Sequence, residues 1–413
     1  MIRKKLVIIV VIVLIINQLK AQSITELLQL AEQNNLALKA LDQEYLAARE
    51  KGAQVGELPD PTVSVGVFPL PIETRFGPQR VKIGAMQTFP NRGMRKAKES
   101  ALNYQADAKG ERLAIEQLAL NFKIKQAYYQ LYQLEKSQLI VQRNIRIMKA
   151  LNQLTLTKVE SGTGSAADVL KVNLKLQELQ KQVEILNHQK KTPTTIINQL
   201  LDRDFATPIV VTDTLALAVL AYDMETLADE IEDTHPLMKM YSFQKEASVQ
   251  NLRVNRQNKR PVISAGIDYI VTDKIDNFDF VENGRDAFML KAGVRVPIFK
   301  DKYGAKELEE ELKIKALTTK QESAKSQFLG AINQAKIDFE TIQLNLELYQ
   351  TQIRTTAGII NVLETQYSAE GKGFDELLQM QISLVNYDLM ILEAIVKSHI
   401  AKAEIEKYLV NGH

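Results

Sequence analysis

The sequence contains no cysteine, no tryptophan and four histidines among 413 residues. Without a thiol, a disulfide bond, a thiolate metal site and lipid attachment at a cysteine are all excluded. The histidines stand far apart and lack the short spacings of metal-ligand pairs: His188, His235, His399 and His413. We therefore expect no zinc site, no thiol chemistry and no cofactor.

An excess of charge of either sign is also missing. The 52 basic and 50 acidic residues nearly cancel, and no block of like charge interrupts the chain. This balance predicts solvated helix faces and no nucleic-acid partner. The sequence has no Ser-His-Asp arrangement, no glycine loop of the phosphate-binding kind and no cluster of metal ligands, so we do not expect an enzyme.

The N-terminus has the pattern of a secretory signal. Basic residues 3–5 precede an apolar run over residues 6–16, and small polar residues follow around Ala21. A membrane-spanning helix needs about 20 apolar residues, more than this run supplies, which makes a transmembrane anchor the weaker alternative. We expect residues 1–21 to be a cleaved signal peptide and the mature chain to be exported.

The rest of the chain matches itself. An offset of 200 places Leu27 on Leu227, Pro61 on Pro261 and Gly66 on Gly266, and an offset of 208 relates the long segments that follow. We expect two repeats, residues 22–213 and 214–413. Each begins with a helix, at 24–55 and 224–258. In the first repeat a strand pair (61–90), a long helix (92–160), a return helix (165–201) and a linker follow; in the second, a strand pair (261–298), a long helix (302–369) and a return helix (374–410).

The long helices carry heptad seams. Apolar or small residues recur every seven positions from Leu113 to Met148, and a second row holds Ile124, Leu131, Ile145 and Val159. The row from Ile332 to Tyr367 repeats this second row 208 residues later. This spacing predicts antiparallel coiled-coil packing against the return helices. A helix over 92–160 would be about 100 Å long, several times the width of a compact domain. The fold class is therefore mainly α with a small β portion.

The strands alternate between apolar and polar residues, as membrane barrels do. Four strands cannot close a conducting barrel, and a bilayer tolerates no open sheet edge, so a membrane location requires several chains. A soluble sheet that packs its apolar face on the helices stays open as an alternative. In the barrel, the polar positions would face the lumen: Lys82, Ser264, Asp268, Lys291 and Arg295.

Three motifs resemble the TolC-type outer-membrane efflux family, the outer membrane factors of tripartite efflux systems. They are residues 58–66 (LPDPTVSVG), 89–93 (FPNRG) and 161–170 (SGTGSAADVL). The resemblance implies a homotrimer whose chains each contribute four strands to a twelve-strand β-barrel in the outer membrane of a Gram-negative bacterium. It also implies a periplasmic tunnel of coiled-coil helices. The tunnel's tip would dock a periplasmic adaptor, or membrane fusion protein, and an inner-membrane pump of the resistance-nodulation-division type.

The resemblance also assigns roles at the two tip turns. Family members have a glycine, a small polar residue and an acidic-apolar-Leu signature there, and the second turn of this chain departs from that pattern at its glycine. The adaptor-docking residues would be Gly162, Ser165, Val169, Leu170, Gly371, Gly373, Leu377 and Leu378. The gate or constriction would use Tyr367, Lys372, Asp168, Asp375 and Glu376. In this gate Lys372 would pair with Asp168, and the Glu376 carboxylates of the three subunits would form an acidic ring. A simpler explanation of Asp168 and Glu376 is helix capping, because each lies in the first turn of a helix.

The function that follows from the resemblance is passive export of small toxic compounds or metal ions across the outer membrane. Metal ions are favoured because residues 69–75 (PLPIETR) and 77–80 (GPQR) are similar to those of relatives in metal-efflux systems. Two alternatives stay open. One is the exit duct of type I protein secretion, and the other is an exported coiled-coil scaffold or adhesion protein without a pore.

Overall fold

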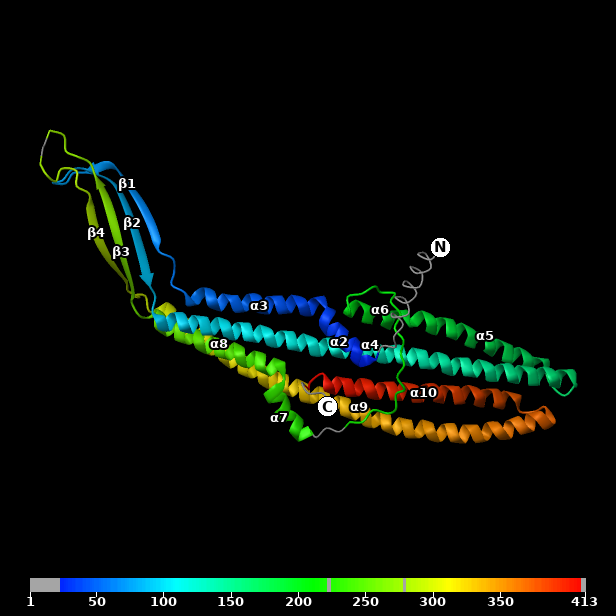
Figure 1. Cartoon of the computed structure of the whole chain (residues 1–413). Helices are drawn as coiled ribbons and strands as arrows, with labels where there is room; N and C mark the ends of the chain where they lie inside the picture. Colours follow the sequence, from blue (N-terminus) through cyan, green and yellow to red (C-terminus); the bar gives the residue numbers. More distant parts are fainter. Residues whose placement is uncertain (1–22, 221–223, 278–279, 410–413) are drawn as a thin grey trace, which may run out of the picture. The chain divides into compact units, whose positions relative to one another are not determined.

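The computed structural model describes residues 23–220, 224–277 and 280–409, so the expected signal peptide and His413 lie outside the described residues. Figure 1 shows long helices and one sheet, which confirms the mainly helical fold class with a four-stranded antiparallel sheet. The elements are α2 Ile24–Asn34, α3 Leu36–Gly56, β1 Thr62–Ile72, β2 Gln79–Phe89, α4 Arg92–Glu160, α5 Ala166–Gln189, α6 Lys191–Leu200, α7 Met224–Thr234, α8 Pro236–Asn258, β3 Val262–Thr272, β4 Ala287–Arg295, α9 Asp301–Glu370 and α10 Phe374–Glu406.

The chain forms two units. One comprises residues 41–113 and 236–323 and contains the sheet; we call it the sheet unit. The other comprises the remaining described residues and contains both helix-to-helix turns; we call it the tip unit. No helix within the described ranges has the length and apolarity needed to cross a bilayer.

The sheet has the order β1-β2-β3-β4, with every neighbouring pair antiparallel. Its central pair, β2 and β3, joins distant parts of the sequence, with Gly84 opposite Asp268 and Ala85 opposite Ile267. Directly opposed residues share one face of a sheet, so this register determines which side chains gather on each side. The outer edges of the sheet are formed by β1 and β4.

The opening helices differ from the prediction because each is interrupted. The first breaks at Asn35, whose side-chain oxygen accepts hydrogen bonds from the backbone N–H groups of Ala37 (3.0 Å) and Leu38 (3.1 Å) and so caps α3. The second breaks at His235, and Pro236 then begins α8, a position where its missing N–H costs nothing. The predicted return helix over 165–201 is likewise divided, into α5 and α6 at Lys190.

The core of the tip unit lies along the predicted heptad seam. Buried side chains from α4, α5, α9 and α10 form one apolar cluster. Val141 and Met148 of α4 and Tyr367 of α9 are fully buried within it. The sevenfold spacing therefore corresponds to packing, as coiled-coil seams do. The buried members are Val141, Met148, Leu151, Val172, Leu179, Leu186, Ile360, Tyr367, Phe374 and Leu377.

His235 is a buried titratable group at the second helix break. Its ring packs 4.5 Å from that of Phe328, centroid to centroid, and it is 4% exposed. Burial lowers the pKa of His235 to about 4.

We therefore expect acid to destabilise the tip unit. Between pH 6.5 and about 4 the unfolded chain protonates this imidazole and the folded chain does not, so stability falls as the pH falls, by about 2 kcal/mol at pH 5. Thermal unfolding between pH 7.5 and 5 measures the loss, and His235→Gln should flatten this part of the profile. Equal slopes in both proteins would refute the assignment.

Candidate functional site

One face of the sheet is apolar and exposed. Along all four strands, the paired side chains on this face include no charged residue. Val63, Val65 and Val67 are each about two-thirds exposed, and Leu290 is 82% exposed. An exposed apolar face of this extent is typical of a surface that contacts a membrane or another protein. The members include Val63, Val65, Val67, Ile83, Ala85, Ile263, Ala265, Ile267, Tyr269, Phe288, Leu290, Ala292 and Val294.

The opposite face carries the charges. Asp268 is fully buried there and pairs with the Lys82 ammonium at 2.7 Å and with that of Lys291. The Ser264 hydroxyl donates to the carbonyl of Gly293 at 3.3 Å. The structure thus brings together three of the predicted lumen residues, Lys82, Asp268 and Lys291, and places Ser264 on the same face. The fifth, Arg295, is exposed at the end of β4 and has no carboxylate of the described residues within ion-pair distance.

Glycines leave room for this ionic cluster. A Cβ built on Gly84 would lie 2.3 Å from the Asp268 carboxylate and 3.1 Å from the Ser64 hydroxyl. A Cβ on Gly66, on the same face of β1, would meet no atom within 4 Å. The carboxylate therefore occupies the space above Gly84.

These two glycines provide a matched pair of variants. We expect Gly84→Ala to displace Asp268 from its lysines and to cost about 1–3 kcal/mol, the usual range for overpacking. Gly66→Ala should change little. Thermal unfolding of the two variants in detergent is the measurement, and similar melting temperatures would show that Asp268 does not require this space.

The first tip turn connects α4 to α5 over residues 161–165. Gly162 adopts a φ of 74°, which an L side chain would strain. The backbone N–H of Gly164 donates to the carbonyl of Lys158 at 2.8 Å, and the Ser165 hydroxyl caps α5 by accepting from the N–H of Ala167. Gly162 and Ser165 therefore have structural roles in reversing the chain.

The second tip turn, between α9 and α10, is shorter and spans residues 371–373. Gly371 and Gly373 have φ values of 69° and 81°, and Gly373 occupies the N-cap position 208 residues after Ser165. The return helices thus begin in the same register, whereas α9 continues two residues further than that offset predicts. This extra length explains why the glycine pattern differs.

The two turns contact each other within the tip unit. A Cβ on Gly371 would lie 2.1 Å from the carbonyl oxygen of Thr163, and the Lys158 ammonium donates to the carbonyl of Ser368. On the adjoining helices, Lys171 of α5 pairs with Asp375 of α10. The turns are therefore joined by backbone packing and charge-assisted hydrogen bonds.

The predicted gate residues are only partly brought together. Tyr367 is fully buried and donates from its hydroxyl to Asp168 at 3.5 Å, and burial raises the pKa of both groups, that of Tyr367 to about 12. Lys372 is exposed, and no ion pair of the described residues joins it to Asp168; Lys171 is the lysine that acts on that carboxylate. Glu376 is exposed in the first turn of α10.

The predicted docking residues differ in accessibility. Leu170 is 69% exposed and Val169 is half-buried, whereas the corresponding Leu377 is completely buried in the core cluster and Leu378 is half-buried. In this conformation the first turn offers apolar side chains to a partner. The second turn uses Leu377 to hold α10 in place.

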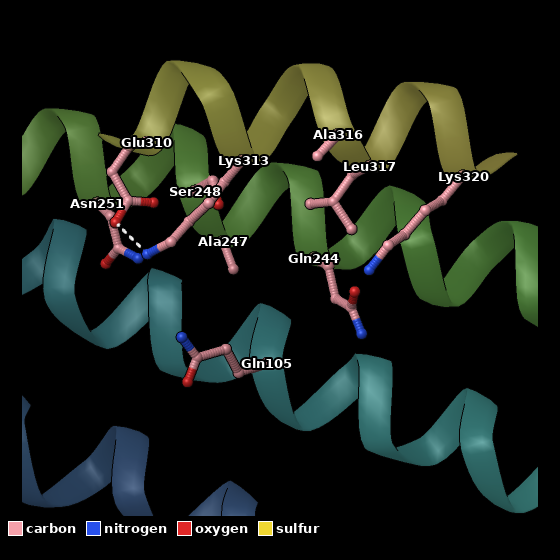
Figure 2. Close-up of a pocket in the computed structure, with 10 residues that line it drawn as sticks. All are labelled: Gln105, Gln244, Ala247, Ser248, Asn251, Glu310, Lys313, Ala316, Leu317 and Lys320. Carbon is pink, nitrogen blue, oxygen red and sulfur yellow. Dashed lines mark hydrogen bonds and ion pairs between the residues drawn. The ribbon is translucent and has the colours of Figure 1, made fainter. Parts of the chain in front are cut away.

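The pattern of the sequence did not reveal a hollow in the sheet unit, which has a volume of about 320 Å³. Polar and apolar side chains of α4, α8 and α9 line it (Figure 2). Glu310, 1% exposed, pairs through one oxygen with Lys306 (2.9 Å) and Lys313 (3.0 Å), and its other oxygen has no hydrogen-bond partner among the described residues. Within these ranges no group of three or more His, Asp or Glu side chains is arranged to hold a metal ion.

Comparison with known proteins relates this architecture to a set of channels. No protein-family model matches the sequence. No curated protein matches it either. Among solved structures, the open-state outer membrane channel MtrE of Neisseria gonorrhoeae is 14% identical and superposes with a TM-score of 0.73 over 94% of this chain and 89% of that one. The outer membrane protein VceC of Vibrio cholerae is 12% identical and superposes with a TM-score of 0.73 over 93% of this chain and 95% of that one.

The outer-membrane channel OprN is 17% identical, with a TM-score of 0.73 over 93% of this chain and 89% of that chain. Identities this low establish a shared fold and nothing finer. The similarity nevertheless extends over almost the whole chain, helices and sheet together. The fold expected from the resemblance is thus confirmed: this chain has the fold of outer-membrane channels.

Proposed function

We propose that the chain is one of three identical subunits of an outer-membrane exit duct. The observation that carries this proposal is the distribution of residues on the two faces of the sheet. One face is apolar, free of charge and exposed, and the other holds the paired charges of Lys82, Asp268 and Lys291. Lipid would cover the first face and water would fill a lumen against the second. The shared fold with outer-membrane channels supports the same location.

Strand count favours a closed ring of subunits. The edge strands β1 and β4 have unpaired backbone groups on their outer sides, which a bilayer does not tolerate. An even number of antiparallel strands gives β1 and β4 opposite directions, so β4 of one copy can pair antiparallel with β1 of the next. Three copies of four strands would close the twelve-strand barrel.

Two further proposals concern the helices. The helix breaks at Asn35 and His235 lie 200 residues apart, the offset that aligns the strands, and this supports two repeats of one unit. The long helices of three copies would form the periplasmic tunnel. Its tip, with Leu170 exposed, would meet an adaptor and an inner-membrane pump of the resistance-nodulation-division type. The cargo would be small toxic compounds or metal ions, and secreted protein is the alternative cargo.

The gate is part of the same proposal. In the closed tip Tyr367 would hold α9 against Asp168 from within the core, and Lys171 with Asp375 would join α5 to α10. Lys372 and Glu376, both exposed, would be available to a neighbouring subunit or to the passage. Lining of a constriction by Tyr367 would require the tip to rearrange.

Membrane extraction and conductance test the duct. We expect the chain to fractionate with outer membranes, to have the mass of a trimer in detergent by light scattering, and to give stepwise conductance in planar bilayers. Recovery as a soluble periplasmic protein without conductance would instead support a scaffold or adhesion protein.

A further inference from the structure

The charged face of the sheet is not electrically neutral. Its charged side chains are Lys82 on β2, Asp268 on β3, and Lys291 and Arg295 on β4. Arg80, at the end of β2, is neutralised by Asp273 at 2.6 Å. Three cations and one anion therefore leave a net charge of +2 on this face of each chain.

The ionic cluster cannot absorb this excess. Asp268 is fully buried between two ammonium groups, and a single carboxylate can balance only one of them. The Lys82 and Lys291 side chains remain 33% and 25% exposed, so each ammonium keeps N–H groups that water or a solute can reach. Arg295 adds a guanidinium that is exposed and has no carboxylate neighbour among the described side chains.

Space beside Lys82 is open. Lys82 lies directly opposite Gly66 in the register of β1 and β2. No atom lies within 4 Å of a Cβ built on Gly66. The sheet therefore leaves room for a small solute next to Lys82, on the face where the positive charge is in excess.

We propose that Lys82, Lys291 and Arg295 form a basic belt that attracts small inorganic anions, with chloride as the probe. The inference rests on the proposed function, because three copies of the belt would then surround one passage and their fields would add. The sign is opposite to that of the acidic ring expected at the tip from Glu376. The barrel section and the tip section would thus favour ions of opposite charge.

Reversal potentials in planar bilayers under a KCl gradient test the belt. Gly66→Asp places a carboxylate beside Lys82, and Gly66→Asn is its uncharged match. Arg295→Gln removes one cation, and Arg295→Lys retains it. We expect Gly66→Asp and Arg295→Gln each to lower the chloride-to-potassium permeability ratio by roughly two- to tenfold, as removal of part of a focusing field implies. The two controls should leave the ratio unchanged.

Salt provides a second signature. The change in the chloride-to-potassium permeability ratio caused by each charge variant should be large at 0.1 M KCl, where the Debye length is about 10 Å. It should nearly disappear at 1 M KCl, where the Debye length is about 3 Å. Normal single-channel conductance with an unchanged ratio in either charge variant would overturn the belt and leave the duct intact. No conductance from the unmodified chain would overturn both. The variants lie on different strands, so if one does not assemble, the other decides.

Discussion

Leu290→Lys is expected to prevent stable insertion of the chain into membranes. Leu290 lies near the middle of β4, is 82% exposed, and stands among apolar neighbours such as Ile267, its partner on β3. A lysine at the midplane on the lipid side of a barrel costs about 2–4 kcal/mol, and a trimer would bear that cost three times. The expected result is loss of membrane-integrated trimer, measured by density-gradient fractionation and by mass in detergent.

The same substitution has the opposite consequence for a soluble sheet. If water covers this face, replacing an exposed leucine by lysine removes an apolar patch and increases solubility. Leu170→Lys, at a residue 69% exposed in the tip unit, is the matched control and should leave insertion unchanged. Normal trimers from Leu290→Lys would therefore contradict the membrane location of the sheet and favour the scaffold alternative.

The sequence predicted those parts of the fold that follow from periodic patterns. Alternation predicted that Phe288, Leu290 and Val294 share the apolar face of a strand, and sevenfold spacing predicted that Val141 and Met148 lie in a buried seam. Each pattern requires only the geometry of its own element. The charge cluster could be foreseen as a set of residues sharing one face. That a fully buried Asp268 lies at the centre of the cluster could not be foreseen, because its position depends on the register between β2 and β3.

The helix breaks left signals that the periodicity obscured. Asn35 is a favourable N-cap residue, and Pro236 is favourable as the first residue of a helix, so both restarts were readable from residue type. The prediction was nevertheless one continuous helix through each segment, 24–55 and 224–258. The capping residues at these positions therefore determined where each helix ends and the next begins.

Side-chain partners at the tip could not be predicted from residue spacing. An offset of 208 relates Asp168 to Glu376, but α9 extends further than α4 does in that register, and the second turn is correspondingly shorter. As a result Lys171 rather than Lys372 is the lysine near Asp168 and Asp375. Tyr367 was expected at a constriction, yet it is also the next member of its heptad row, and in this conformation it is buried.

Tyr367→Ala is expected to release the tip turns from each other. The ring is fully buried, packs 5.2 Å from that of Phe374 between centroids, and carries the hydroxyl that reaches Asp168. Truncation of a large aromatic residue in a core costs about 3–5 kcal/mol, and here it also removes one hydrogen-bond donor from the buried Asp168 carboxylate. We expect faster hydrogen exchange in peptides spanning residues 155–175 and 360–380, with exchange in the sheet unit unchanged.

Tyr367→Phe separates packing from hydrogen bonding. It retains the ring against Phe374 and removes only the hydroxyl, so the cost should be about 1 kcal/mol. If the closed tip limits the passage, Tyr367→Ala should raise single-channel conductance far more than Tyr367→Phe does. Faster exchange at the tip without a rise in conductance would show that Tyr367 holds the turns together but that the limiting constriction lies elsewhere. Unchanged exchange in both variants would contradict its role in the core, because a loss of about 3–5 kcal/mol of local stability makes local opening, and with it exchange, faster.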